Sequence, residues 1–102
     1  MLRVTRAPYY CLLLILTSLL PPVAAAEYFV FFGTYTGPKS KGVYVSRYDS
    51  SNGKLTEPEL AGEVSNPSWV TLDPTGKFLY AVSELGKEGI ITSFSINPQT
   101  GK

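Results

Sequence analysis

Short apolar runs, separated by residues that favour turns, follow one another along the chain after residue 26. They are rich in β-branched and aromatic residues and too short for typical helices, which is the pattern of strands. The run at 89–96 alternates and places Ile90, Thr92, Phe94 and Ile96 on one face. The chain is therefore predicted to be all-β, with strands at 28–34, 43–48, 55–64, 68–72, 78–82 and 89–96. The third is short, irregular or at an edge, because Pro58 divides it.

The segments between these runs carry turn residues at defined places. Asn52-Gly53 suits a tight turn, because both residues tolerate positive φ angles. In Asp73-Pro74-Thr75-Gly76, the proline presets φ at the first central position and the glycine relieves the constraint at the exit. Asp73 should accept hydrogen bonds from the backbone N–H groups that follow it, so we interpret it as a turn residue rather than a catalyst.

Part of the sequence is repeated. Residues 48–54 align with residues 96–102 at an offset of 48, and residues 29–34 align with residues 79–84 at an offset of 50. A period of about 45 to 50 residues in an all-β chain indicates the four-stranded blade of a β-propeller. The alternative is a small sandwich whose hairpins resemble one another.

The order of the strands favours the propeller. Residues 65–102 would supply the first three strands of a blade, and residues 28–64 the second, third and fourth strands of the blade before it. A first blade without its innermost strand is what ring closure by the C-terminal end of a chain requires. The chain then holds about one and a half blades, whereas closed rings have about four to eight, so we expect a truncated product or a partial sequence.

This organisation leaves sheet edges and apolar faces uncovered. Residues 27–102 on their own are therefore expected to aggregate or to remain disordered.

The first 26 residues have the composition of a secretory signal peptide. Arg3 and Arg6 precede an apolar run at 11–20, and small residues follow at 23–26. The run is about ten residues long, short of the roughly 20 that span a bilayer. Cys11 lies at its beginning, where a lipoprotein anchor would not have it, and leaves with the peptide. Cleavage near Ala26 predicts a secreted or periplasmic protein without a membrane segment.

Charge and residue types limit the chemistry that residues 27–102 can perform. They hold seven basic and eight acidic side chains, a net charge of −1, so nothing in them attracts nucleic acid or an anionic membrane. The chain has no His, and its one Cys lies in the signal peptide. The commonest general base and the commonest ligands of transition metals are thus missing, and we predict no metal and no other cofactor.

Three sequence elements follow one another over residues 28–102: Gly33-Thr34-Tyr35-Thr36, the hairpin NPSWVTLDPTGKFLYAVSE at 66–84, and two Gly-Lys turns one repeat apart. In this order they resemble the N-terminal part of the seven-bladed β-propeller lactonases, the 6-phosphogluconolactonase type that also includes propeller-type carboxymuconate cyclases. The resemblance implies ring-opening hydrolysis of a sugar lactone, or the related lactonisation, in a cleft at the central channel.

The same resemblance limits what can be assigned to this chain. The His, Arg and Glu residues to which the family's chemistry is attributed belong to later blades and have no counterpart here, so no catalytic residue is assigned. The signal peptide is a departure from the family, because a phosphorylated sugar lactone belongs to the cytoplasm. An exported relative is expected to act on an unphosphorylated lactone, or to have lost that substrate.

Glu84, Thr34 and Tyr35 are the candidate substrate-binding residues. Glu84 ends a strand near the expected channel mouth, where a carboxylate could orient a water molecule or bind sugar hydroxyls. The alternative is an exposed acid that pairs with Lys87. Thr34, Tyr35 and Thr36 occupy the equivalent end one blade earlier, where their hydroxyls could bind a sugar or serve packing and local backbone hydrogen bonds alone.

The large aromatic residues are interpreted as structural. Trp69 could stack on a sugar, but its place in the predicted innermost strand favours burial between neighbouring blades. Tyr28, Phe29, Phe31 and Phe32 are expected to lie in the core.

Three hypotheses for function follow. The intact protein is an exported lactone hydrolase of carbohydrate metabolism with a small-molecule lactone as substrate, or it is a non-enzymatic propeller that binds protein or carbohydrate, since the fold hosts many functions. In the third, the chain is a truncated product without a function of its own.

Overall fold

The computed structural model describes residues 26–102, so the predicted signal peptide lies outside the described residues except for Ala26. All regular secondary structure in this part of the chain is β-strand. The strands are β1 Glu27–Gly33, β2 Gly42–Asp49, β3 Lys54–Leu55, β4 Glu59–Glu63, β5 Pro67–Leu72, β6 Phe78–Leu85 and β7 Glu88–Ser95. The predicted all-β fold is confirmed, as is the division of the third predicted strand around Pro58. No helix among residues 26–102 has the length and apolarity to cross a membrane.

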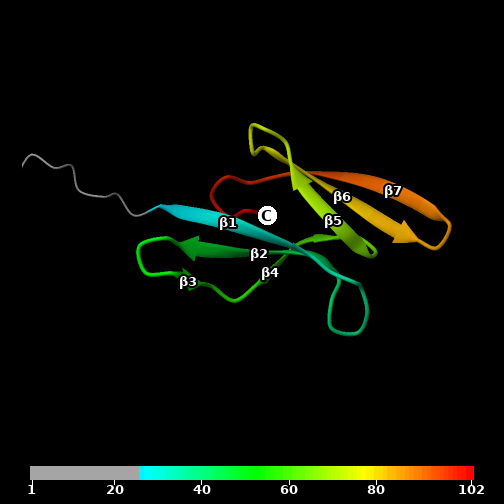
Figure 1. The fold of residues 1–102 in the computed structure, drawn as a ribbon, viewed down its shortest axis with the longest axis horizontal. Coiled ribbons are helices and arrows are strands. Elements are labelled where there is room, and N and C mark those ends of the chain that lie inside the picture. Colours follow the sequence, from blue (N-terminus) through cyan, green and yellow to red (C-terminus); the bar gives the residue numbers. More distant parts are fainter. Residues whose placement is uncertain (1–25) are drawn as a thin grey trace, which may run out of the picture.

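The strands form two antiparallel sheets (Figure 1). In the first sheet, β1 pairs with β2, and β2 pairs with both β3 and β4. In the second sheet the order is β5-β6-β7. Figure 1 shows the C-terminal segment, in red, returning from β7 toward β1. Its Gly101 packs so closely on the first sheet that a Cβ there would lie 2.7 Å from the Phe29 ring.

The core lies between the inner faces of the two sheets. Val43 of β2 and Leu79 and Ala81 of β6 are buried at its centre. The partly buried residues packed against them are Phe31, Ala61, Val64, Val70, Phe94 and Ile96. The alternation predicted for β7 is confirmed at Thr92 and Phe94, which are partly buried while Ile91, Ser93 and Ser95 are exposed. Burial of one face of each sheet fixes how the two repeats pack together.

The turn between β5 and β6 has the predicted geometry. Asp73 Oδ1 accepts hydrogen bonds from the backbone N–H groups of Lys77 and Phe78, each at 2.9 Å, and Oδ2 accepts from that of Thr75 at 3.1 Å. Gly76 takes a positive φ of 69°. The Thr75 hydroxyl, followed by the Phe78 N–H, lowers the pKa of Asp73 from 3.8 to about 2. The carboxylate is thus committed to the turn.

The repeat is confirmed at its two Gly-Lys turns. Gly53 and Gly101 have φ angles of 70° and 76°. Each donates its N–H to the carbonyl oxygen four residues earlier, Asp49 for the first at 2.9 Å and Asn97 for the second at 2.8 Å. The offset of 48 therefore holds in three dimensions.

The predicted offset of 50 for the preceding strand is wrong by one residue. Phe31 pairs with Val45 in the first sheet, whereas Tyr80 pairs with Ser93, the equivalent of Val45, in the second. The structural offset between β1 and β6 is therefore 49. A slip of one residue moves a strand's side chains to the opposite face, so Phe31 is equivalent to Tyr80 and not to the buried Ala81.

Trp69 is 68% exposed and Tyr28 is 55% exposed, because each lies on a sheet face that residues 26–102 do not cover. Tyr28 is therefore not part of the core between these two sheets, whereas burial of Trp69 between neighbouring blades stays a prediction for the full-length protein. β6 continues beyond the strand predicted at 78–82, and a two-residue turn joins it to β7, since Leu85 pairs with Glu88.

Candidate functional site

The candidate residues on the first sheet lie in the segment that follows β1. Thr34 Oγ1 donates a hydrogen bond to the carbonyl oxygen of Gly42 at 2.6 Å and also contacts the Ser40 hydroxyl. This closes the loop between β1 and β2, so the Thr34 hydroxyl serves the local backbone. Tyr35, one residue later, is 72% exposed, and within residues 26–102 its hydroxyl forms no hydrogen bond. Of the two predicted residues, only Tyr35 remains available to a ligand.

Glu84 lies near the end of β6, where it is exposed and pairs with Gly89 of β7. Its exposure agrees with the alternative of an exposed acid, although within residues 26–102 its carboxylate forms no ion pair with Lys87. The offset of 49 makes Glu84 the equivalent of Tyr35 rather than of Thr34. Tyr35 follows the end of β1 and is unpaired, whereas Glu84 is still paired within β6, so the two exposed side chains correspond by counting and not by backbone pairing.

Asn66, just before β5, connects these two positions. Its Oδ1 accepts hydrogen bonds from Thr36 N at 3.0 Å and from Thr36 Oγ1 at 2.9 Å. Its carbonyl oxygen accepts from Ser68 N at 2.8 Å and from Glu84 N at 3.2 Å. The sequence places Asn66 at the start of the hairpin motif, but its role was not predicted. The signal that could have indicated it is an Asn directly before a strand. Asn tolerates a positive φ, which is 45° at this position.

The backbones of the two sheets approach closely at this junction. A Cβ on Gly33 would lie 2.3 Å from the carbonyl oxygen of Pro67, and only glycine avoids that contact. The side chains of Tyr35 and Glu84 are brought to the same end of the two sheets but not into contact. Neither the Thr34 nor the Tyr35 hydroxyl is hydrogen-bonded to Glu84 in the described part of the chain.

A shallow depression borders the junction. It has a volume of about 450 Å³ and is lined by Thr36, Lys41, Glu63, Val64 and Ser65. Lys41 Nζ and Glu63 Oε1 lie 4.0 Å apart, both well exposed, so this ion pair contributes little to stability. Beside Thr36, the depression offers one positive and one negative side chain, so neither charge dominates.

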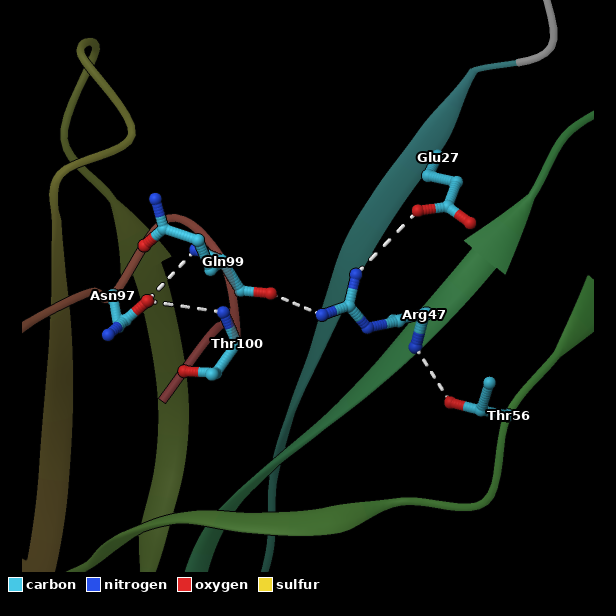
Figure 2. Close-up of polar contacts among 6 residues, drawn as sticks. All are labelled: Glu27, Arg47, Thr56, Asn97, Gln99 and Thr100. Carbon is cyan, nitrogen blue, oxygen red and sulfur yellow. Dashed lines mark hydrogen bonds and ion pairs between the residues drawn. The ribbon is translucent and has the colours of Figure 1, made fainter.

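A second polar cluster, centred on Arg47, was not predicted from the sequence (Figure 2). The guanidinium lies 3.6 Å from Glu27 Oε2 and donates a hydrogen bond to the carbonyl oxygen of Gln99. It also lies 5.0 Å from the centre of the Phe29 ring. These contacts tie the turn after β7 to the first sheet, so we interpret Arg47 as structural. Its partner Gln99 is 52 residues away, which a local pattern could not indicate.

The chemistry available at the strand ends is hydrogen bonding. Tyr35 can donate and accept, and Glu84 can accept, which suits the hydroxyl groups of a sugar. Among residues 26–102 no group of three or more His, Cys, Asp or Glu side chains is placed to hold a metal ion. The hydroxyl–carboxylate pairs of the described residues, Ser51 with Asp49 and Thr75 with Asp73, belong to turns. The geometry is that of a contribution to a binding surface.

The two packed sheets, with strands related by a repeat of 48 to 49 residues, define neighbouring parts of a β-propeller. Residues 29–102 match the family model described as "Lactonase, 7-bladed beta-propeller". The chain therefore belongs to the seven-bladed β-propeller lactonase family, as the sequence resemblance implied, and the sandwich alternative is set aside.

Two relatives from bacteria are named 6-phosphogluconolactonase. The protein from Bacillus subtilis is 29% identical over 76 residues, which cover 74% of this chain and 22% of the relative. The protein from Formosa agariphila is 35% identical over 75 residues, which cover 71% of this chain and 21% of the relative. The chain thus spans about a fifth of the length of these relatives.

Solved structures show the same relationship. A crystal structure from Bacteroides fragilis, provisionally named a 6-phosphogluconolactonase, is 32% identical with a TM-score of 0.69. The match covers 80% of this chain and 23% of that one. A structure from Bacteroides uniformis with the same provisional name is 32% identical with a TM-score of 0.67, covering 74% of this chain and 22% of that one.

Proposed function

We propose that this sequence is the N-terminal part of an exported lactone hydrolase that opens the ring of a sugar lactone. Residues 28–64 supply all but the innermost strand of one blade, and residues 65–102 supply the first three strands of the next. The observation that carries the proposal is the match of residues 29–102 to the lactonase family. The relatives named 6-phosphogluconolactonase support a lactone as the substrate class.

The role of the described residues in this function is substrate binding at the strand ends. The candidates are Tyr35, which follows β1, and Glu84, near the end of β6, and both are exposed. The catalytic groups are proposed to come from later blades of the full-length protein, as the resemblance to the family implies.

The proposed substrate is an unphosphorylated lactone, and the proposed location is the periplasm or the exterior of the cell. The composition of residues 1–26 supports export. A carboxylate at Glu84 also suits a neutral sugar better than a phosphate, because like charges repel.

The test is an assay of acid release from a panel of aldonolactones, with and without a 6-phosphate, using the protein extended to the length of its relatives. Because lactones hydrolyse spontaneously, the rate without enzyme is subtracted. We expect acceleration of unphosphorylated lactones, and residues 27–102 alone serve as an inactive control. A folded full-length protein that accelerates no lactone would contradict the proposal and favour the non-enzymatic binding protein.

A further inference from the structure

Asn66 carries an unusual number of hydrogen bonds for one residue between strands. Its side-chain oxygen receives two from Thr36, its N–H donates to Thr36 Oγ1 at 3.3 Å, and its carbonyl oxygen receives two more from Ser68 and Glu84. Thr36 lies 30 residues away along the chain. Asn66 therefore joins the segment after β1, the start of β5 and the end of β6.

The orientation of the Asn66 side chain is fixed by its partners. The backbone N–H of Thr36 can only donate, so the atom that faces it must be the oxygen of the amide. A flipped amide would bring two donors together. The positive φ of Asn66 adds a second requirement, since Asn and Gly tolerate this conformation better than other residues.

The surroundings of Asn66 leave little room for an alternative arrangement. The carbonyl oxygen of the next residue, Pro67, lies 2.3 Å from the position of a Cβ on Gly33. Asn66 itself is held between Thr36, in the segment after β1, and Glu84 of β6. A change in its side chain would release Thr36, and with it the neighbouring Tyr35, while the backbone link to Glu84 could remain.

We propose that Asn66 is a positioning residue, which holds Tyr35 and Glu84 in a fixed relation at the substrate-facing end of the two repeats. It acts through Thr36 and through the Glu84 backbone, and it is not itself a catalytic residue. The inference rests on the proposed function, because it assumes that this end of the sheets faces the substrate. Beyond that function, the inference assigns to Asn66 the role of fixing the ends of two successive repeats relative to each other.

The experiment compares Asn66→Gly with Asn66→Asp in the full-length protein. Glycine keeps the positive φ but removes the side-chain acceptor, whereas aspartate keeps an acceptor oxygen for Thr36. We expect Asn66→Gly to lower kcat/KM by about 10- to 100-fold, mainly through a higher KM, because a small misplacement of binding groups is costly. Asn66→Asp should remain close to the unaltered protein.

Asn52→Gly is the matched control for stability. Asn52 also bonds its own turn, with Oδ1 accepting from Lys54 N at 2.8 Å and Nδ2 donating to Asp49 Oδ2 at 3.0 Å. This turn follows the end of β2 that lies away from Asn66. Loss of the Asn52 hydrogen bonds should therefore lower the melting temperature without changing KM. Asn66→Gly that leaves KM unchanged, or Asn66→Asp as impaired as Asn66→Gly, would overturn the inference.

Hydrogen exchange gives a readout that does not depend on activity. The Thr36 amide should exchange faster in Asn66→Gly than in the unaltered protein, and Asn66→Asp should restore its protection. If the unaltered protein hydrolyses no lactone, the proposed function fails while this result still reports on the junction. Unchanged protection of Thr36 in Asn66→Gly would overturn the inference even if the protein is an active lactonase.

Discussion

Three side chains, Asp49, Asp73 and Asn97, close turns in the same way. Each accepts a hydrogen bond from a backbone N–H two residues later: Asp49 from Ser51 at 2.8 Å, Asp73 from Thr75 at 3.1 Å and Asn97 from Gln99 at 2.9 Å. The bonds favour the charged form of the two carboxylates, and the pKa of Asp49 is lowered chiefly by the Ser51 hydroxyl and then by the Ser51 N–H. We therefore interpret a short polar side chain at the start of a turn as structural rather than catalytic.

The titration of Asp73 tests this assignment. Its pKa in the folded protein is about 2, below the ordinary value of 3.8, chiefly because of the Thr75 hydroxyl and then the Phe78 N–H. Since the folded pKa is the lower one, the stability that this carboxylate contributes is complete above about pH 4 and is lost as the pH falls through about 2. Chemical shifts of the Asp73 carboxyl carbon, followed by NMR from strongly acidic to neutral pH, should give a midpoint near the folded value.

Thr75→Val provides the control for Asp73, because it removes the hydroxyl and keeps the backbone N–H. The midpoint of Asp73 should then rise toward 3.8. A midpoint at or above that ordinary value in the unaltered protein would mean that the carboxylate does not bond the turn.

The distance along the chain over which a residue acts decides how well its role could be predicted. Asp73 bonds residues two to five positions later, and its role was predicted correctly from the sequence. Asn66 bonds Thr36 from 30 positions away, and Arg47 bonds Gln99 from 52. Neither role was predicted, because these bonds exist only once the two sheets have packed.

At the scale of strands, the pairing register decides which residues face the core. Val43 of β2 packs against Leu79 and Ala81, while Ile91, the equivalent of Val43 one repeat later, is 71% exposed. Val43 thus faces the second sheet, whereas Ile91 is on the face of the second sheet that points away from the first. This is the arrangement of successive blades, where one face of each sheet packs backward and the other forward.

The close approach of β1 and β5 can be tested at Gly33. A Cβ there would lie 2.3 Å from the Pro67 carbonyl oxygen, which is backbone and cannot rotate away. We expect Gly33→Ala to lower the free energy of unfolding by about 1–3 kcal/mol, as overpacking commonly does. Denaturant unfolding of the full-length protein measures it.

Gly37→Ala is the matched control for Gly33→Ala. Gly37 lies in the loop that follows β1, where an added Cβ would meet no atom within 4 Å and where φ is not positive. The substitution should leave stability nearly unchanged. Equal effects of the two substitutions would show that β1 and β5 can separate without cost.

Strand positions were predictable from apolar runs and turn residues, but the register between repeats was not. The strands at 43–48 and 78–82 were predicted within their observed bounds, because β-branched and aromatic runs between turns leave few alternatives. The offset of 50 came from matching residue types in strands where nearly every position is apolar. Such a pattern cannot separate one register from the next, and only the pairing with β2 and β7 fixed it at 49.

On the scale of the molecule, the outer face of the second sheet is apolar and uncovered within residues 26–102. Trp69, Val82 and Ile91 lie side by side across β5, β6 and β7, since Trp69 pairs with Val82 and Val82 with Ile91. Trp69 and Ile91 are 68% and 71% exposed. Burial of Trp69 was predicted between neighbouring blades, and within residues 26–102 no second sheet covers this face.

The uncovered face predicts how residues 27–102 behave when they are produced alone. Exposed apolar side chains in register across three strands favour association between copies. We expect light scattering to rise with concentration, and Ile91→Lys to move the onset to a severalfold higher concentration by placing a charge at the edge of this face.

Leu55→Lys is the matched control, because Leu55 is 51% exposed but belongs to the two-residue strand β3 of the other sheet. If Leu55→Lys helps as much as Ile91→Lys, association does not depend on the Trp69, Val82 and Ile91 face. A sharp cooperative melt of the unaltered segment as a soluble monomer would show that this face needs no covering blade.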